Sequence, residues 1–293
     1  MRTIGMIGLG KIGMPIADLL LKSGFNVVGY RRSAMDGLRA AGGTPLASPA
    51  EVAAQADIIL SCLPSEAALD EVVAGPKGLV HGMRAGQICL ELGTYPVSVK
   101  ERQRERLAKI GAIFLDGEIS GTPGMVAARK SAVYISGDAQ ACESAKPVIA
   151  GFSDACFYFG AFGSSIKVKL IANLLVTLNI TATAEAMTLA RQTGIDLNMI
   201  IQAVASGAGN SAQFAIRAPW MAERKFLPAQ GSIELVNHYQ KAAKDMAIDL
   251  GVATPMLDKT IELFDKALAN GLADYDVAAI ADVISALPPP NKV

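Results

Sequence analysis

Short apolar runs alternate with amphipathic helical segments along the first half of the chain. In the runs, apolar residues follow one another without regular polar alternation, which is typical of strands buried on both faces of a sheet. Between the runs, apolar positions recur every three or four residues, the spacing of one face of a helix. The runs predict strands at residues 3–7, 26–30, 57–63, 87–91, 114–118, 133–136 and 156–159. Strands and helices that alternate in this way favour βαβ units and a largely parallel sheet.

Residue types that begin and end helices support the helical segments. A helix is predicted over residues 13–22, and Gly24 follows it where glycine commonly ends a helix. Ser48, Pro49 and Glu51 predict another helix start, with serine as the cap, proline in the first turn and glutamate three residues after the cap. These signals do not depend on hydrophobic spacing.

The pattern changes after Gly163. Strand-like runs disappear, and helices are predicted at residues 166–193, 198–206, 212–223, 233–250, 255–270 and 277–286. Pro288, Pro289 and Pro290 cannot continue a helix, because proline lacks a backbone N–H and clashes with the preceding turn. We therefore predict a doubly wound α/β domain at residues 1–162, followed by an all-helical domain at residues 163–293.

Composition and charge narrow the class of protein. Apolar residues make up 51% of the chain and charged residues 18%, which argues against a disordered chain. Lys plus Arg and Asp plus Glu balance at 27 each, so neither a nucleic acid nor an anionic membrane is expected as partner. The glycine-containing apolar start is expected to be a strand and loop rather than a signal peptide. Polar residues interrupt the apolar stretch 170–190, which predicts a buried helix rather than a membrane span.

The cysteines and histidines offer no metal-binding or redox motif. The four cysteines show no CxxC spacing, which favours buried thiols in a reducing, cytoplasmic setting. His81 and His238 are the two histidines of the chain, too few for a histidine-based metal site, and we predict no metal.

A glycine-rich loop follows the first predicted strand and opens the first predicted helix. Gly8, Gly10 and Gly13 give it the spacing GxGxxG, with Lys11 and Ile12 between the last two. Gly8 permits a tight turn, Gly10 lets the backbone approach a pyrophosphate, and Gly13 lets helix and strand pack closely. The helix N-terminus adds free N–H donors and the positive end of its dipole. In this setting the spacing predicts a Rossmann dinucleotide-binding site.

The end of the second predicted strand selects the dinucleotide. A site for NAD places an acidic residue there to bind the ribose hydroxyls. Here Arg31, Arg32 and Ser33 follow Tyr30, and no acid occurs before Asp36. Arginine makes bidentate, charge-assisted bonds to phosphate, so this segment suits the 2′-phosphate of NADP. We predict NADP(H) as the cofactor, with NAD as the less favoured alternative.

Two polar residues share a face of the long predicted helix. Lys169 and Asn173 are four positions apart and point the same way. An amine and an amide directed inward from an otherwise apolar helix need partners, because burial without them is costly. This predicts a site on that face. Lys167 cannot share the face and is expected at the surface.

Several spaced motifs resemble those of the β-hydroxyacid dehydrogenases, which include 3-hydroxyisobutyrate dehydrogenase, tartronate semialdehyde reductase and the glyoxylate/succinic semialdehyde reductases. The resemblance runs over nearly the whole chain. Residues 116–123, DGEISGTP, resemble the segment in which Ser-Gly-Gly holds the substrate carboxylate. Ser120 and Gly121 match that pattern, and Thr122 replaces the second glycine.

A second segment resembles the family's catalytic pattern GxxGxGxxxKxxxN. Gly160, Gly163, Lys169 and Asn173 are in register with it, and Ser165 replaces the third glycine. The resemblance implies that Lys169 is the general acid/base, giving a proton to the carbonyl oxygen as hydride arrives and accepting it in the reverse direction. It also implies that Asn173 orients the substrate oxygen or the lysine.

Three further segments carry contacts over from the family. Lys244, followed by an aspartate, resembles a Lys-Asp pair on a C-terminal helix that reaches the substrate or the nicotinamide side. Leu63 and Pro64 match a loop along the dinucleotide. Thr94 matches a residue near the nicotinamide ribose, and Gly93 replaces a serine there.

The resemblance implies an oxidoreductase that transfers hydride between NADP(H) and a small β-hydroxy acid or semialdehyde. Substrates of the 3-hydroxyisobutyrate, tartronate semialdehyde, glyoxylate and succinic semialdehyde types all stay open. A C-terminal domain like that of 6-phosphogluconate dehydrogenase is implied, and its apolar helices favour a homodimer or homotetramer. The alternatives are an imine reductase of the same architecture, against which Lys169 argues, and a non-catalytic NADP-binding module, against which Ser120, Lys169 and Asn173 together argue.

Overall fold

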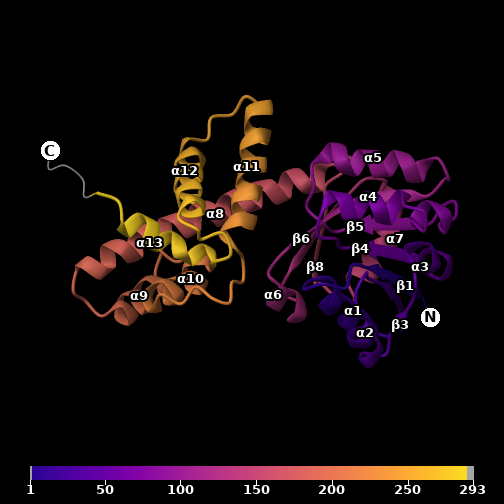
Figure 1. Ribbon diagram of the computed structural model, residues 1–293, viewed down its shortest axis with the longest axis horizontal. Coiled ribbons are helices and arrows are strands. Elements are labelled where there is room, and N and C mark those ends of the chain that lie inside the picture. Colours follow the sequence, from indigo (N-terminus) through magenta and orange to yellow (C-terminus); the bar gives the residue numbers. More distant parts are fainter. Residues whose placement is uncertain (1, 289–293) are drawn as a thin grey trace. The chain divides into compact units, whose positions relative to one another are not determined.

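One sheet of eight strands organises the N-terminal part of the protein (Figure 1). The computed structural model describes residues 2–288 and divides into two units, Met1–Lys169 and Leu170–Val293. The strand order is β3-β2-β1-β4-β5-β6-β7-β8, and every neighbouring pair is parallel except β6 and β7. The strands are β1 Thr3–Ile7, β2 Asn26–Tyr30, β3 Thr44–Pro45, β4 Ile58–Ser61, β5 Ile88–Glu91, β6 Ile113–Ser120, β7 Ala132–Ser136 and β8 Ala155–Tyr158.

All the predicted strands occur, and the structure adds β3. This strand is two residues long and ends in Pro45, so it carries no alternating or continuous apolar pattern that could reveal it. Its place at the sheet edge suits proline, which cannot donate a ladder hydrogen bond. The antiparallel direction of β7 was not predicted either, because hydrophobic spacing carries no information about strand direction.

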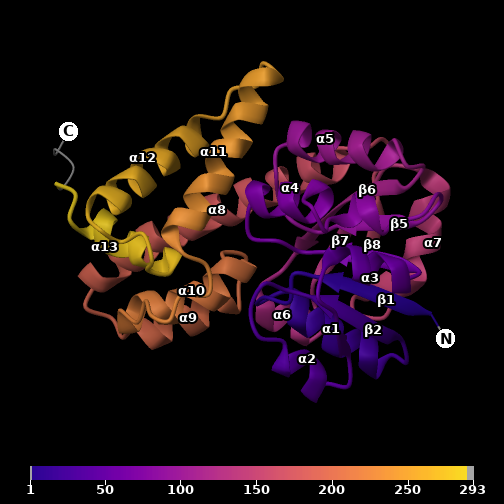
Figure 2. The same cartoon turned by 45° about the vertical axis from the view of Figure 1, so that its right-hand side comes forward.

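Helices cover both faces of the sheet and give it two separate cores (Figure 2). On one face α1, α6 and α7 pack against the strands, and on the other face α3, α4 and α5 do so. The helices of this unit are α1 Gly13–Lys22, α2 Asp36–Ala40, α3 Pro49–Gln55, α4 Glu66–Ala74, η1 Leu79–His81, α5 Val97–Ala108, α6 Pro123–Ala127 and α7 Ala139–Ile149. The predicted cap of α3 forms, since Ser48 Oγ accepts a hydrogen bond from Glu51 N at 3.2 Å.

Helices alone build the second unit, with a core of its own from α8, α10, α11, α12 and the C-terminal turns. Its elements are α8 Ser164–Gln192, α9 Leu197–Ala205, α10 Ala212–Glu223, α11 Ile233–Asp249, α12 Pro255–Ala269, η2 Val277–Ala279 and α13 Ile280–Ser285. The predicted fold class, doubly wound α/β followed by helices, is confirmed. We keep 1–162 and 163–293 as the proposed domain limits, because the change from sheet to helices falls between β8 and α8.

Two sequence predictions about the helical region have different outcomes. By length and composition α8 could cross a membrane, and its Ile180, Ala184 and Met187 pack in the core of the helical unit. Only 39% of its most apolar window is buried, less than predicted for a buried helix. The predicted helix 277–286 is in fact a 3-10 turn followed by α13, because the Asp276 side chain caps the turn by accepting from Ala278 N. Of the proline tail, the residues from 289 onward lie outside the described part of the chain.

Candidate active site

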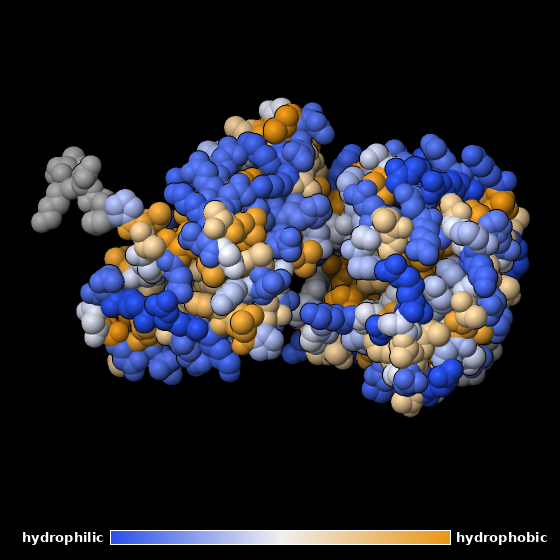
Figure 3. Space-filling model, in the orientation of Figure 1, coloured by the Kyte–Doolittle hydropathy of each residue, from blue (hydrophilic) through white to orange (hydrophobic). Residues whose placement is uncertain are grey.

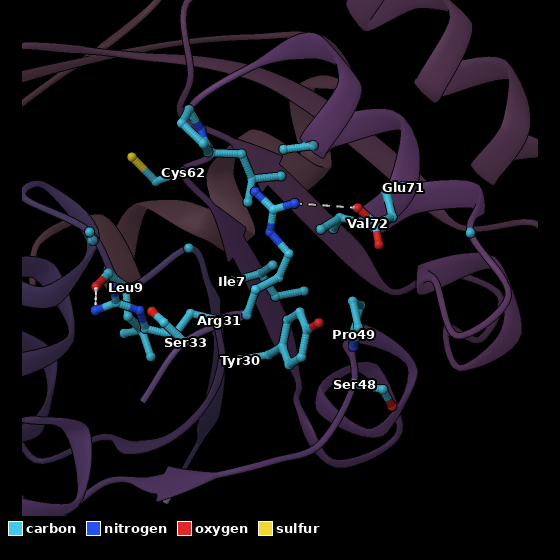
Figure 4. Close-up of a pocket in the computed structure, with 18 of the residues that line it drawn as sticks. Ile7, Leu9, Tyr30, Arg31, Ser33, Ser48, Pro49, Cys62, Glu71 and Val72 are labelled. Carbon is cyan, nitrogen blue, oxygen red and sulfur yellow. Dashed lines mark hydrogen bonds and ion pairs between the residues drawn. The ribbon is translucent and has the colours of Figure 1, made fainter. Parts of the chain in front are cut away.

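A cavity of about 620 Å³ opens at the carboxyl ends of β1, β2 and β4 (Figure 4). The chain leaves β1 toward β2 on one side and reaches β4 on the other, so the cavity lies where the strand order reverses, the usual dinucleotide site of such sheets. Ten of the predicted cofactor residues line it: Gly8, Gly10, Lys11, Ile12, Gly13, Arg31, Arg32, Ser33, Leu63 and Pro64.

The glycines of the loop meet different steric conditions. Gly8 has a φ of +91°, and a Cβ there would lie 2.1 Å from the Cys62 carbonyl oxygen. A Cβ on Gly13 would lie 1.9 Å from the Gly8 carbonyl oxygen, so this position needs glycine for packing. At Gly10 a Cβ would meet nothing within 4 Å, although Gly10 lines the cavity. The protein itself therefore does not require glycine at position 10, whereas a ligand approaching the backbone would.

The far end of the cavity carries positive charge. The exposed Arg31 donates from Nη1 to the Leu9 carbonyl oxygen at 2.9 Å, a bond marked by a dashed line in Figure 4. Arg32 is exposed and its Nη1 lies 3.9 Å from Glu71 Oε2, a pair that is weak in water. Lys77 also lines this cavity. Its sequence position, in a turn after α4, gave no signal of that role.

The opposite wall is built by β2 and the start of α3. Figure 4 shows Tyr30, Ser48 and Pro49 together along one side of the cavity, with Val72 and Glu71 of α4 on another. The wall residues from α3 and α4 were not predicted, because they come from helices distant in sequence from the glycine loop. A pocket with glycine-lined backbone at a helix N-terminus, arginines at its end and this volume fits a dinucleotide.

Farther along the strand ends, Thr94 follows β5. Its hydroxyl donates to Glu118 Oε2 at 2.5 Å. The neighbouring Gly93 stands in place of the family's serine. The structure explains the absence of a side chain there, because a Cβ would lie 2.6 Å from Cε2 of Tyr95. The Tyr95 hydroxyl in turn donates to the Leu63 carbonyl oxygen at 2.6 Å and holds that loop of the cavity wall.

Lys169 lies on the second turn of α8 and turns back to the end of β6. Its Nζ donates to the Ile119 carbonyl oxygen at 2.7 Å. Burial lowers the pKa of this amine, and the charge of Glu118 opposes that effect. Lys167, two residues away, is exposed, as predicted. A helix lysine with a lowered pKa, held in place by a strand carbonyl, has the properties of a general acid/base.

The start of α8 is fastened to β6 and β7 by buried polar groups. Ser136 Oγ donates to Asp116 Oδ2 at 2.9 Å and accepts from Ser165 N at 3.1 Å. Ser165 Oγ donates to the Asp116 carbonyl oxygen at 3.2 Å. The serine that replaces the third glycine of the motif is therefore an anchor of the helix. Gly163, with a φ of +87°, makes the turn that precedes it.

The predicted carboxylate cradle continues β6. Ser120 is the last residue of the strand and is half-buried, one position beyond the carbonyl that holds Lys169. A Cβ on Gly121 would lie 2.8 Å from Ser131 Cβ, so glycine is required there. Thr122 caps α6, its Oγ1 accepting from Met125 N at 3.3 Å. The hydroxyl that departs from the family pattern thus has a structural partner.

Two predicted residues belong to the second unit. Asn173 follows Lys169 by one helical turn of α8, and its Nδ2 is buried with no hydrogen-bond partner among the described residues. A buried amide donor without a partner is able to bind a ligand. Lys244 is held within its own unit, with Nζ 2.6 Å from Asp258 Oδ1 and 3.4 Å from Thr254 Oγ1. Both of these contacts lie within the second unit.

Sequence reasoning missed a cluster of buried charges beside Lys169. Lys100 of α5 is fully buried and its Nζ donates to Asp116 Oδ1 at 2.7 Å and to Glu118 Oε1 at 2.8 Å. These carboxylates raise the pKa of Lys100 against the effect of burial. Burial raises the pKa of Glu118 and that of Glu91, the latter to about 7, while Lys100 opposes the shift in both. The available signal was the presence of acids in otherwise apolar strands.

Comparisons with known proteins agree with the fold and the motifs. Residues 3–160 match the family described as the NAD binding domain of 6-phosphogluconate dehydrogenase, and residues 163–284 match the NAD-binding domain of NADP-dependent 3-hydroxyisobutyrate dehydrogenase. The L-threonate dehydrogenase of Cupriavidus necator is 30% identical over 99% of each chain. Glyoxylate/succinic semialdehyde reductase 2 of Arabidopsis thaliana is 27% identical over 97% of this chain and 80% of that protein.

A solved structure extends the likeness to three dimensions. The crystal structure of 3-hydroxyisobutyrate dehydrogenase from Salmonella typhimurium superposes with a TM-score of 0.88 at 25% identity, covering 97% of this chain and all of that one. The two family matches together span nearly the whole chain, and the glycine loop and the lysine segment described above lie within them. The chain therefore belongs to the β-hydroxyacid dehydrogenase family of oxidoreductases.

Proposed function

We propose that the protein transfers hydride between NADP(H) and a small β-hydroxy acid or its semialdehyde, with Lys169 as the general acid/base. The observation that carries the proposal is the amine of Lys169, held at the end of β6 with a pKa lowered by burial. The carbonyl that binds this amine belongs to Ile119, the neighbour in sequence of Ser120, the first residue of the carboxylate cradle. The names of the relatives from C. necator and A. thaliana, a threonate dehydrogenase and a semialdehyde reductase, support a small oxygenated acid as substrate.

Each residue in the proposal has a defined task. Ser120, Gly121 and Thr122 hold the substrate carboxylate through a hydroxyl and backbone N–H groups. NADPH, when bound, supplies the hydride. Lys169 gives its proton to the carbonyl oxygen during reduction and stabilises the charge that develops there, and it takes the proton back during oxidation. Asn173, whose buried Nδ2 has no partner among the described residues, orients the substrate oxygen or the lysine.

The preference for NADP(H) follows from the charges at the end of β2. Arg31, Arg32 and Ser33 line the cavity, and none of them is an acid that would bind the ribose hydroxyls of NAD. Both arginines are exposed, and the one carboxylate contact of the pair within residues 2–288 is the 3.9 Å approach of Arg32 to Glu71. A 2′-phosphate placed between them would make charge-assisted bonds. Lys77 adds a third positive side chain to the same cavity.

Four further parts of the proposal rest on the sequence alone. Lys244, whose Nζ lies 2.6 Å from Asp258 Oδ1, is proposed to contact the substrate or the nicotinamide side. Thr94 is proposed to lie near the nicotinamide ribose. A homodimer or homotetramer and a cytoplasmic location stay predictions.

A turnover assay tests the proposal. Wild-type protein is mixed with NADPH and, separately, glyoxylate, succinic semialdehyde, tartronate semialdehyde, methylmalonate semialdehyde and a cyclic imine, and loss of the reduced nicotinamide absorbance is followed. We expect turnover of at least one semialdehyde, faster with NADPH than with NADH. Turnover confined to cyclic imines would instead assign an imine reductase. Tight NADPH binding without turnover of either class would assign a non-catalytic module.

A further inference from the structure

We propose that Glu118 is a positioning residue whose buried carboxylate holds Thr94 and keeps the Lys169 amine in its protonated, proton-donating form. The inference rests on the proposed function of Lys169, and it concerns a residue of the segment 116–123 to which the family resemblance assigned no role. It joins the nicotinamide side of the site to the proton donor through one side chain.

The geometry of Glu118 is fixed from both ends. The side chain is fully buried on β6, its Oε1 accepts from Lys100 Nζ at 2.8 Å, and its Oε2 accepts from Thr94 Oγ1 at 2.5 Å. The next residue along the strand, Ile119, offers the carbonyl oxygen that binds Lys169 Nζ at 2.7 Å. Consecutive residues of β6 therefore supply the carbonyl oxygen that binds Lys169, from Ile119, and the neighbouring carboxylate, from Glu118.

The other ionisable groups around Glu118 either bind other partners or are neutral. Asp116, on the same strand, accepts from Lys100 and from Ser136 and serves the start of α8. Glu91, at the end of β5, accepts from Gly93 N at 2.8 Å. Burial raises the pKa of the Cys62 thiol, which follows β4, to about 12, so this group is neutral.

Glu118 is thus the carboxylate that acts on Lys169. Burial lowers the pKa of Lys169 and the charge of Glu118 raises it. Lys100 stabilises the ionised form of Glu118 by direct contact, although burial favours the neutral acid. With Glu118 ionised, Lys169 keeps its proton until the carbonyl oxygen of a substrate takes it. Without that charge, desolvation alone would act on the amine and the donor would be lost at lower pH.

Competitive acetylation of Lys169 tests this coupling without any substrate. The fraction of Lys169 acetylated is measured by mass spectrometry across pH, since only the neutral amine reacts. In Glu118→Gln, which keeps the size of the side chain and an acceptor oxygen, we expect Lys169 to be acetylated about tenfold faster near neutral pH, because loss of a neighbouring opposite charge has at least that effect. Glu91→Gln, an equally buried change, should leave the labelling profile of Lys169 as in wild type.

Catalytic pH profiles supply the second readout. The reduction rate falls at alkaline pH as Lys169 loses its proton, and in Glu118→Gln this fall should occur at lower pH. The oxidation rate rises as Lys169 becomes neutral, and this rise should also occur at lower pH. A purely structural defect would lower both rates without moving either limb. Glu118→Asp, which keeps the charge, should restore the wild-type limbs.

Three outcomes would overturn the proposal: unchanged acetylation of Lys169 in folded Glu118→Gln, an equal shift in Glu91→Gln, or equal loss of rate at every pH. If Glu118→Gln does not fold, Thr94→Val removes the hydroxyl that holds the carboxylate and should raise acetylation in the same direction; no change there also overturns it. If wild-type protein turns over no semialdehyde, the proposed function fails, whereas the labelling result still decides the coupling.

Discussion

Lys169 illustrates how a single side chain acquires chemistry from its surroundings. Its amine is buried enough for its pKa to fall, yet it is held by the carbonyl of Ile119 and influenced by the charge of Glu118. Lys100 of α5 is buried more deeply and paired directly with two carboxylates, so its pKa rises instead. Of these two lysines, the one with the direct ion pairs is structural and the one without them is suited to move a proton.

Removing the amine of Lys169 should abolish most of the chemistry. We expect Lys169→Ala to lower kcat by about 100-fold or more, the usual contribution of general acid/base catalysis, with little change in NADPH affinity. Steady-state kinetics and a fluorescence titration with NADPH measure the two effects. Lys167→Ala, an exposed lysine on the same helix, is the matched control. A rate near that of wild type in Lys169→Ala would remove this lysine from the mechanism.

Neutralising the arginines should change the choice of cofactor. In Arg31→Gln with Arg32→Gln we expect the NADPH over NADH preference in kcat/KM to fall by at least about tenfold, because each charge-assisted bond to a phosphate contributes on the order of 1.5 kcal/mol or more. Arg39→Gln, which removes an exposed arginine paired with Asp36 outside the cavity, should leave the preference intact. An unchanged preference in the double variant would refute the 2′-phosphate assignment.

The buried carboxyl of Glu91 should make stability depend on pH. Burial raises its pKa from 4.5 to about 7, so between these values the folded protein holds a proton that the unfolded chain has lost. Stability contributed by this group is therefore present below the unfolded pKa and declines as pH rises through the folded one, by at most about 1.4 kcal/mol per pH unit.

Urea unfolding at about pH 5 and about pH 8 measures that decline. In Glu91→Gln, which imitates the protonated side chain, the decline should be shallower than in wild type. Glu105→Gln, the same change at an exposed position of α5, should follow the wild-type slope. Identical slopes for wild type and Glu91→Gln would show that the carboxyl is ionised in both states.

At the scale of elements, the strand–loop–helix unit of β1 and α1 separates packing from binding. Gly13 touches the Gly8 carbonyl so closely that any side chain must displace backbone, whereas Gly10 faces open space in the cavity. The same residue type therefore serves the fold at one position and a ligand at the other. The anchoring of α8 through Asp116 and Ser165 is a second case in which an element is placed by buried polar bonds.

Alanine at these two glycines should give different results. Gly10→Ala should keep the melting temperature of the free protein while weakening NADPH binding by about tenfold or more, since a methyl group would stand where the pyrophosphate approaches. Gly13→Ala should lose about 1–3 kcal/mol of stability through overpacking, and cofactor binding with it. Thermal unfolding and NADPH titration distinguish the two. Tight NADPH binding by Gly10→Ala would place the pyrophosphate away from this backbone.

At the scale of the whole molecule, an apolar surface remains on the helical unit. Ile248, Leu250, Val252 and Met256, where α11 meets α12, are each more than half exposed. Figure 3 shows hydrophobic surface at that tip. Apolar patches of this kind on a stable protein commonly mark contacts between proteins.

We expect the protein to be a homo-oligomer that buries this surface. Leu250→Glu with Met256→Glu should shift the mass measured by light scattering toward the monomer, because two charges would be desolvated in the contact. Lys259→Glu, on an exposed face of α12, should leave the mass unchanged. A monomeric wild-type protein would contradict the expectation, and an intact oligomer in the double variant would place the contact elsewhere.

The sequence by itself determined seven of the eight strands, the change from sheet to helices, the glycine loop and the placement of Lys169 and Asn173 on one helix face. These features depend on neighbours a few positions away, through hydrophobic spacing, glycine conformation and helical periodicity. They could be predicted from the sequence because local geometry decides them. The departures at Gly93 and Ser165 were visible in the sequence, but their reasons, the ring of Tyr95 and the carbonyl of Asp116, were not.

Only the tertiary structure decided which ionisable groups share a buried cluster. Lys100 lies in the charged stretch KERQRER, where every position looks like surface, and it is buried because β6 brings Asp116 and Glu118 to it. The pairing of Glu118 with Thr94 and the tie of Lys244 to Asp258 likewise join residues from different elements. A charge becomes stable or reactive through the partners that folding places around it, and those partners are distant in sequence.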